Sequence, residues 1–336
     1  MTTDAIASIQ APDGSIPWER GRHTDPWNHV EAAMGLDVGE RHAEAAAAYR
    51  WLARTQRQDG SWFASYTDSL PDTGMVDANF CAYIATGVWH HYLATGDDAF
   101  LGEMWPVVER AVEFVLCLQM PDGSIAWARD DGYRPWPGAL LTSCSSIHLS
   151  LRCAVTIAET LGAERPDWEL SIASLRRAIT EREWAFESKE RFAMDWYYPV
   201  LGTAVEGSAA RTRLAEGWHV FVETGSGARC TSDRPWVTTG ESGELVLACH
   251  AAGLEEEARH IFRWVQHLRA EDGLYFTGAN APAGDPWPCT EKTTWSAGAI
   301  LLAADALYGE GGTTGLFKGE GLVAAPSVFG SLEDPV

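Results

Sequence analysis

The chain has 336 residues, 46% of them hydrophobic and 21% charged, which is typical of a globular protein with one large core. Its formal net charge of −22 at pH 7 disfavours binding to nucleic acid or to an anionic membrane, because both need clustered Lys and Arg. No apolar run approaches the roughly 20 residues that a membrane-spanning helix needs.

A short repeat runs along the chain. Asp-Gly, followed shortly by an aromatic residue, occurs at Asp13-Gly14, Asp59-Gly60, Asp122-Gly123 and Asp272-Gly273. Three of these pairs follow a segment of strong helical character, and Asp-Gly after a helix is a signal to stop and turn. The repeat has irregular spacing, so it predicts helical hairpins more strongly than a solenoid.

Two kinds of helix alternate between these turns. Four segments have good helix formers and a charged face: Val38 to Arg57, Asp97 to Gln119, Pro166 to Glu187, and Leu254 to Arg269. Four others are apolar nearly all round: Asp77 to Ala94, Ser145 to Leu161, Glu241 to Ala252, and Thr293 to Leu307. A helix without a charged face is buried on most sides. Adding Trp27–Leu36 and a helix near Tyr198–Ala215 raises the number of buried helices to six.

This alternation predicts an all-α fold, an (α/α)6 barrel in which an inner ring of helices is surrounded by an outer ring. No stretch shows the pattern of a strand longer than four or five residues. We expect a single barrel domain over residues 1–310, followed by a Gly-rich C-terminal tail over residues 311–336.

The barrel topology predicts where the function lies. If the chain always enters the inner helices from the same end, their N-termini share one rim. The entry segments hold nearly all the loop tryptophans and the unpaired-looking carboxylates: Asp25–Asn28, Asp72–Asn79, Asp130–Ser146, Asp195–Tyr198, Arg229–Glu241 and Asp285–Trp295. The loops at the other end, such as Leu36-Asp37 and Thr95-Gly96, are short and plain. A barrel whose loop tryptophans and carboxylates gather on one rim is typical of an enzyme or a binding protein.

Carboxylates among aromatic rings, with few Lys, favour an uncharged polyhydroxylated ligand such as an oligosaccharide. Two carboxylates that flank a glycosidic bond supply a general acid and a base or nucleophile. The candidate catalytic residues on the rim are Asp130, Asp131, Asp195, Glu241 and Glu291. Structural roles remain open for several: a capping box between Thr238 and Glu241, an N-cap at Asp77, and a solvated turn at Asp130-Asp131.

The predicted substrate-binding residues are rim residues that could stack on sugar rings or bind hydroxyl groups. They are Asp25, Trp27, Asn28, Asp77, Trp127, Trp196, Tyr197, Tyr198, Arg229, Trp236, Trp287 and Trp295. We expect no metal and no cofactor. His90 and His91 are adjacent on a helix and point about 100° apart, which makes a poor metal pair. The chain also lacks a phosphate-binding Gly loop, GxSxG and CxxC.

Two families resemble parts of this chain. Gln56 to Trp62 (QRQDGSW) resembles the repeat of squalene/terpenoid cyclases and protein prenyltransferases, which are α/α toroids, although their DxDD acid and zinc-binding set are absent. Residues 75–308 are more similar to six-hairpin glycosidases of the glucoamylase-like type. The similarity is carried by Trp105 to Trp127, which includes DGSIAW, and by the segment from Pro235 to Ser296.

The glycosidase resemblance implies a glycoside hydrolase with an acid Glu just after a Trp, where this chain has Ala128, and a base Glu near Tyr275–Thr277, where it has none. Asp130 or Asp131 then replaces the acid, and Glu291, with or without Asp195, replaces the base. Two alternatives stay open: an isoprenoid cyclase or transferase-like protein, and a catalytically inactive sugar-binding barrel.

The seven Cys show no close pairing, and the N-terminal residues lack the basic and apolar regions of a secretion signal. We therefore expect reduced thiols and a cytoplasmic location.

Overall fold

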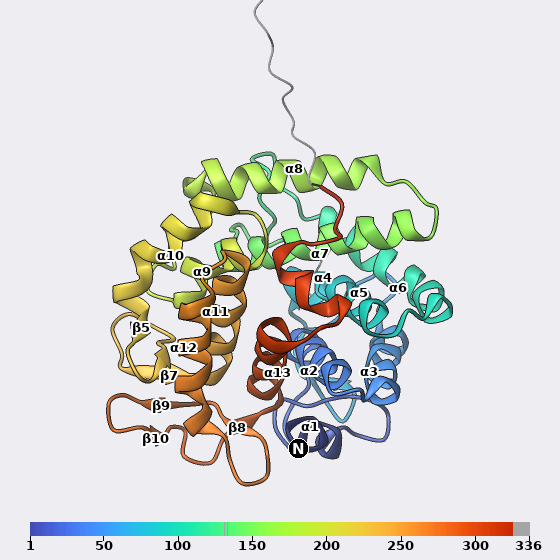
Figure 1. Ribbon diagram of the computed structural model, residues 1–336. Helices are drawn as coiled ribbons and strands as arrows, with labels where there is room; N and C mark the ends of the chain where they lie inside the picture. The colour runs from blue at the N-terminus through green and yellow to red at the C-terminus, as the bar shows by residue number, and fades with distance from the viewer. Residues whose placement is uncertain (131, 133, 325–336) are drawn as a thin grey trace, which may run out of the picture.

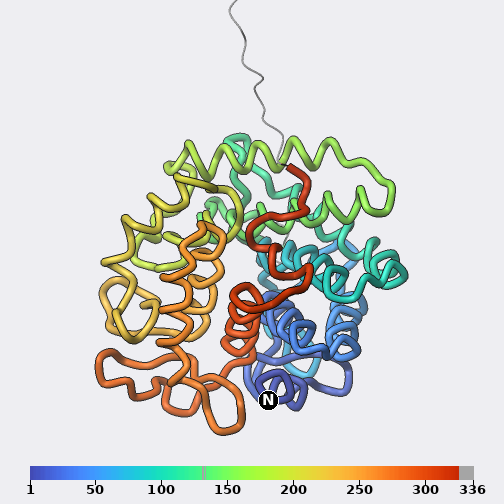
Figure 2. The backbone as a smooth tube through the Cα atoms, in the orientation of Figure 1, coloured from blue at the N-terminus to red at the C-terminus, as the bar shows by residue number. Residues whose placement is uncertain are grey.

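The computed structural model describes residues 1–130, 132 and 134–324 (Figure 1). In this part of the chain, an inner ring of helices surrounds the molecular axis. Its members are α2 (Pro26–Val38), α4 (Ala78–Ala82) with α5 (Ile84–Thr95), α7 (Leu141–Thr160), α9 (Ala193–Leu201), α11 (Thr239–Ala251) and α13 (Thr294–Tyr308). Each helix packs against the next, and α13 packs against α2, which closes the ring (Figure 2). The predicted (α/α)6 barrel is confirmed.

The outer helices lie against this ring. They are α1 (Thr2–Ile9), α3 (His42–Thr55), α6 (Asp98–Leu116), α8 (Pro166–Glu181), α10 (Gly207–Phe221) and α12 (Glu255–Val265). The two kinds of helix differ as the sequence predicts. In the inner helix α7 every residue from Ser143 to Ala158 is buried, whereas in the outer helix α12 only Ala258, Ile261 and Val265 are buried. None of the helices in the described ranges combines the length and apolar character that a membrane span needs.

Short antiparallel strands join the rim loops. They are β1 (Tyr66–Thr67), β2 (Leu70–Pro71), β3 (Val76–Asp77), β4 (Ala128–Arg129), β5 (Val222–Glu223), β6 (Gly227–Ala228), β7 (Trp236–Thr238), β8 (Tyr275–Phe276), β9 (Gly278–Asn280), β10 (Asp285–Pro286) and β11 (Lys292–Thr293). β3 pairs with β4, so that Asp77 lies opposite Ala128, and β9 lies between β7 and β10. The pairs β1–β2, β5–β6 and β8–β11 complete the set in the described residues. These links hold neighbouring entry segments together.

One predicted helix is wrong. The segment near Tyr198–Ala215 is two helices, because α9 ends at Leu201 and α10 begins at Gly207. Between them, Thr203 has a φ of +60°. A Cβ at Gly202 would lie 2.0 Å from the backbone oxygen of Ser145, so the chain must turn there without a side chain. The tertiary approach of α7, which the sequence does not reveal, sets this break.

The ends of the chain complete the barrel. The sequence prediction did not include α1, which packs against α2 and α13 as the outer helix of the last hairpin. The segment expected as a Gly-rich tail begins with the 3-10 helix η3 (Gly312–Lys318), which packs against α5, α11 and α13. The division of the chain at residue 310 stays a prediction. Two further 3-10 helices, η1 (Glu183–Ala185) and η2 (Gln266–Leu268), follow α8 and α12.

The Asp-Gly repeat has a structural role. Each of its glycines has a left-handed φ: +92° at Gly14, +86° at Gly60, +91° at Gly123 and +90° at Gly273. A Cβ at these positions would lie 2.4, 2.1, 2.5 and 2.8 Å from the backbone oxygens of Ala47, Arg110, Ser174 and Met1, respectively. The first three belong to α3, α6 and α8, the outer helices that follow each turn, and Met1 is the N-cap of α1. The turn therefore brings one hairpin against the backbone of the next.

A glutamine four residues before each of three glycines strengthens this contact. Gln56 Nε2 donates to the carbonyl oxygens of Gly60 and of Val107 in α6, both at 2.9 Å. Gln10 and Gln119 make the same pair of bonds across their own turns. Each glutamine thus satisfies carbonyl groups on both sides of the junction between outer helices.

We expect Gly60→Ala to lower the free energy of unfolding by about 3 kcal/mol, because Ala is strained at this φ and its Cβ overlaps Arg110. Gly96→Ala is the matched control: Gly96 has a φ of +64° with open space around it, so the loss should be about 1 kcal/mol. Urea unfolding of both variants measures the difference. Equal losses would show that the close approach of α6 adds nothing.

Candidate active site

Two aspartates, the buried Asp25 and the partly buried Asp77, cap neighbouring inner helices at the rim. Asp25 is the N-cap of α2, where its Oδ1 accepts from the backbone N–H of Asn28 at 2.9 Å and its Oδ2 from the Asn28 side-chain amide at 2.5 Å. Asp77 is the N-cap of α4, where its Oδ1 accepts from the backbone N–H groups of Asn79 and Phe80. The N-cap role left open for Asp77 is confirmed.

These two carboxyl groups also influence each other. Burial raises the pKa of Asp25, against the lowering effect of the Asn28 hydrogen bonds. Burial raises the pKa of Asp77 to about 7, and the negative charge of Asp25 raises it further. Near neutral pH the pair therefore retains a proton, which is the property that a general acid needs.

Glu241 lies at the start of α11, two inner helices away from Asp25 around the ring. It is 5% exposed, and the Thr238 hydroxyl donates to its Oε2. The capping box left open by the sequence does not form, because the Thr238 side chain bonds to the carboxylate and not to the helix N-terminus. Glu241 is thus a rim carboxylate without a capping role.

An aromatic cluster joins these carboxylates, and we name Trp18, Trp27, Tyr83 and Trp295 the rim cluster. Trp295 stacks on Trp18, with ring centroids 5.7 Å apart, and meets Trp27 at 5.9 Å. Trp27 in turn meets Tyr83 at 5.4 Å. A Cβ at Gly240 would lie 2.4 Å from the Trp295 ring, so this indole covers the residue before Glu241. The rim cluster therefore extends from the helix that Asp25 caps to the first turn of α11.

Buried polar atoms without partners lie at the same end of the inner helices as the rim cluster. They all lie within the first two turns of inner helices: Trp27 Nε1, Asn28 Oδ1, Asn79 Oδ1, Ser146 Oγ and Trp295 Nε1. None of these atoms has a hydrogen-bond partner among the described residues. Buried polar groups are normally paired, so unpaired donors and acceptors beside aromatic faces are available to a polar ligand.

A small cavity beneath the rim holds two more carboxyl groups. Its lining includes Glu31, Tyr83, Ser146, Tyr198 and Glu244, and Phe317 of η3 closes it. Tyr83 Oη donates to Glu31 Oε2 at 2.5 Å, and Tyr198 Oη donates to Glu244 Oε1 at 2.9 Å. Burial raises the pKa of Glu31 to about 7. Burial, with the charge of Glu31, raises the pKa of Glu244 well above its usual range.

Several predicted site residues lie in other places. Asp195 and Trp196 line a pocket of about 390 Å³ with Arg213 of α10. Asp195 Oδ1 accepts from the Thr142 hydroxyl at 2.6 Å, and burial raises its pKa. Tyr197, next in the chain, instead points to the inner cavity and donates to Glu244 Oε2.

The remaining predicted residues lie on the outer parts of the rim loops. Asp130 is exposed and accepts from the backbone N–H of Arg134, while Asp131 lies outside the described residues. Glu291 is half-buried, and its Oε1 accepts from the Thr277 hydroxyl at 2.7 Å. The other members form local pairs: Trp127 with Trp136, Trp236 with Trp287, and Arg229 with Glu223.

The structure brings Trp27 and Trp295 together in the rim cluster and places Asp25, Asn28, Asp77 and Glu241 at the starts of inner helices. The site roles that the sequence predicted for these residues stay predictions. Sequence reasoning missed Glu31. The available signal was a lone acid within a mostly apolar segment of a buried helix, WNHVEAAMGL. Such an acid needs a buried partner.

Comparisons with known proteins point in one direction. No protein family model matches the chain. Over 319 residues the chain is 48% identical to the MMP endo-(1,4)-3-O-methyl-alpha-D-mannosidase of Mycolicibacterium hassiacum, covering 95% of this chain and 88% of that protein. It is also 21% identical over 148 residues to an uncharacterized glycosyl hydrolase of Methanocaldococcus jannaschii, covering 43% of this chain and 23% of that protein.

Solved structures share the fold. A glycosidase superposes with a TM-score of 0.73 at 15% identity, covering 94% of this chain and 95% of that one. A D-mannose isomerase superposes with a TM-score of 0.69 at 10% identity, covering 91% and 96% of the two chains. At these identities the likeness shows the architecture alone.

We expect Glu31→Gln to change how stability depends on pH. Glu31 has a pKa of about 7 in the folded protein against an ordinary value of 4.5, so its stabilising contribution is complete below about pH 4.5 and is lost as the pH rises through about 7. Gln keeps an acceptor for Tyr83 and does not ionise. From pH 4.5 to pH 8 the variant should gain up to about 3 kcal/mol relative to the unsubstituted protein.

Urea unfolding at several pH values measures this difference. The control is Glu159→Gln, at an exposed position of α7. A difference between Glu31→Gln and the unsubstituted protein that stays constant with pH would contradict the raised pKa.

Proposed function

The chain belongs to the family of the M. hassiacum endo-mannosidase and is a glycoside hydrolase, and we propose that it cleaves internal (1,4) bonds between 3-O-methyl-α-D-mannose units. The family membership rests on 48% identity across 95% of the chain. It confirms the resemblance to glycosidases in the sequence. The substrate and the roles of individual residues are our proposal.

One observation carries the substrate proposal: two of the unpaired buried polar atoms of the rim, Trp27 Nε1 and Trp295 Nε1, belong to the rim cluster itself. A 3-O-methyl sugar has the matching chemistry. Its hydroxyl groups can pair with Trp27 Nε1, Trp295 Nε1 and Asn28 Oδ1, while its methyl group and ring carbons suit indole faces. Such a sugar carries no charge, so the net charge of −22 does not repel it.

We assign the general acid to the Asp25–Asp77 pair. Glycoside hydrolysis needs a protonated carboxyl that gives its proton to the leaving glycosidic oxygen. The pair supplies one near neutral pH, because burial raises the pKa of both groups and the charge of Asp25 raises that of Asp77. The sequence favoured Asp130 or Asp131 for this role. Asp130, however, is exposed on a loop, which offers a carboxyl group no burial.

We assign the base to Glu241. It lies across Trp295 from the helix that Asp25 caps, so a sugar placed over the rim cluster has the acid on one side and Glu241 on the other. From there Glu241 would remove a proton from the attacking water, or attack the anomeric carbon itself. Identifying the first anomer released distinguishes these routes. Glu291 and Asp195, the bases favoured by the sequence, instead accept hydrogen bonds from Thr277 and Thr142.

We also place the enzyme in the cytoplasm. All seven of its cysteines are free thiols, which suits a reducing compartment.

We expect the protein to cut an oligosaccharide of (1,4)-linked 3-O-methyl-α-D-mannose at internal bonds, and Glu241→Gln or Asp25→Asn to lower kcat about 10²–10⁴-fold. Asn is itself a good N-cap, so Asp25→Asn should still fold. Mass spectrometry of the products and circular dichroism of the variants measure both effects.

The controls are Glu291→Gln and Asp195→Asn. Both variants keep the proposed acid and base, so kcat should stay within about threefold of the unsubstituted protein. An unmethylated (1,4)-α-mannan oligosaccharide tests the preference for the methyl group. Full activity in Glu241→Gln would refute our assignment of the base, and no cleavage of either oligosaccharide would refute the substrate.

We expect kcat/KM to decrease as the pH rises above about 7, because the acid must be protonated and Asp77 has a pKa of about 7. The apparent pKa belongs to the pair. Asp77→Asn removes the repelling charge beside Asp25, so the alkaline limb of the pH profile should move to lower pH. A rate that stays constant from pH 6 to pH 9 would contradict the role of the pair.

A further inference from the structure

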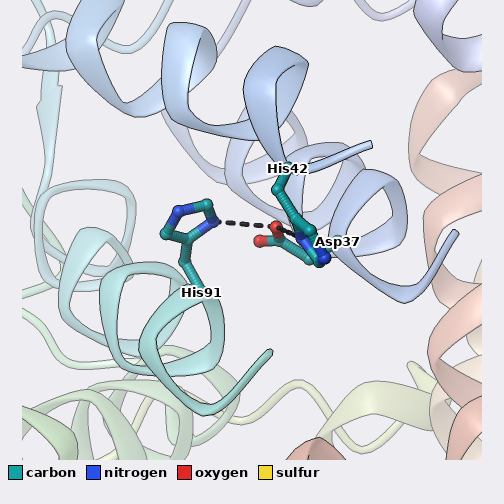
Figure 3. A group of neighbouring side chains, drawn as sticks. All are labelled: Asp37, His42 and His91. Carbon is teal, nitrogen blue, oxygen red and sulfur yellow. Dashed lines mark hydrogen bonds and ion pairs between the residues drawn. The ribbon is translucent and has the colours of Figure 1, made fainter. Parts of the chain in front are cut away.

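At the end of the ring opposite the rim cluster, three side chains from different helices converge (Figure 3). Asp37 lies near the C-terminus of α2, His42 is the first residue of α3, and His91 lies in α5. His91 Nδ1 is 2.8 Å and His42 Nδ1 is 3.0 Å from Asp37 Oδ1. All three candidate ligand atoms lie within 4.8 Å of one another.

Burial makes this cluster unusual. The Asp37 side chain is fully buried and that of His91 is 4% exposed, while His42 is 38% exposed and faces solvent. Asp37 Oδ2 has no hydrogen-bond partner among the described residues, and neither do the two ring nitrogens of the buried His90. His90 Nδ1 is 3.9 Å from Asp37 Oδ2. A buried carboxylate oxygen and a buried imidazole that are both unpaired call for an explanation.

A bound metal ion would explain these unpaired groups. Two imidazole nitrogens and a carboxylate oxygen, with room for a fourth ligand, are a recurring set for Zn²⁺ in proteins. We propose that Asp37, His42 and His91 bind a divalent transition metal, of which Zn²⁺ fits best. The unpaired Asp37 Oδ2 lies beside this site and would complete the ligand set.

Binding requires the three ligand atoms to shift. Zn²⁺ bonds of 2.0–2.2 Å in a tetrahedron separate the ligand atoms by about 3.3 Å, so the separations of 2.8 and 3.0 Å from Asp37 Oδ1 must widen by about 0.5 and 0.3 Å. The separation between the two histidine nitrogens, which is at most 4.8 Å, must close by up to about 1.5 Å. The metal would take the place of the Nδ1 protons that now lie between the imidazoles and Asp37, and those protons would leave to solvent. His42 can move, because it is half exposed at the start of α3, and it gives the ion an entry path.

The sequence argument against a His90-His91 pair is compatible with this site. Adjacent helical residues point in different directions, so the two histidines do not chelate together. His91 alone meets Asp37 and His42, which lie on either side of the short connection between α2 and α3. A metal there would tie three helices of the first two hairpins together at the end away from the substrate. We therefore infer a stabilising role for it.

The test begins with the full-length protein after treatment with a chelator. ZnCl₂ should bind with one equivalent per chain and raise the Tm by at least about 3 °C at saturating metal. Co²⁺ in its place should give the visible absorption of a tetrahedral N/O site. His42→Ala should abolish both effects, and His42→Gln gives a second variant if the first is unstable. The matched control, His267→Ala, changes an exposed histidine in η2 and should bind as the unsubstituted protein does.

Three results would overturn the proposal. The first is no rise in Tm and no binding by the chelator-treated protein. The second is equal affinity in His42→Ala, which would mean an adventitious ion only. The third is a thiolate-to-cobalt charge-transfer band, which would place the metal on an exposed cysteine such as Cys117 or Cys289. A loss of kcat at 25 °C on chelation would refute the purely stabilising role, whereas failure of the hydrolysis assays would leave the metal measurements unaffected.

Discussion

The close contact between each Asp-Gly turn and the next outer helix is the constraint on which the barrel depends. At Gly60 the backbone passes so near the carbonyl of Arg110 that no side chain fits, and Gln56 bonds across the same junction. Three turns repeat this contact, so each of these turns joins its hairpin to the next outer helix in the same way. Gly273 makes the closing contact with Met1, which explains why the first helix of the chain belongs to the last hairpin.

This closure sets the electrostatics of the site. Every inner helix begins at one rim, where unpaired N–H groups favour a carboxylate and lower its pKa. Asp77 receives two such hydrogen bonds, yet burial dominates and its pKa rises to about 7. Capping and acid catalysis are therefore compatible in one residue: the hydrogen bonds fix the position of the carboxyl group, and the loss of water decides its protonation.

The sequence predicted the fold better than the site, for physical reasons. Charged and apolar helices differ in composition along their whole length. The alternation of these two kinds of helix along the sequence therefore revealed the outer and the inner ring. The sequence did not predict the break after Leu201, because this break depends on the approach of Ser145 from another helix. Within the proposed site, Asp25, Glu241 and Trp295 were singled out by their place at helix starts. The sequence could not show that Asp130 is exposed while Asp77 is partly buried, since burial depends on how the rim loops fold over the helices.

The cavity beneath the rim adds two buried acids to the site, Glu31 and Glu244. Replacing Glu31 and Glu244 by apolar residues of similar size would remove a desolvation cost, so stability alone does not explain two buried acids. Three tyrosine hydroxyls, from Tyr83, Tyr197 and Tyr198, orient them, and Tyr83 also belongs to the rim cluster. Tyr83 thus connects the acids of the floor to the aromatic surface above. Its hydroxyl fixes Glu31 while its ring supports Trp27, so the floor and the rim of the site are one packed unit.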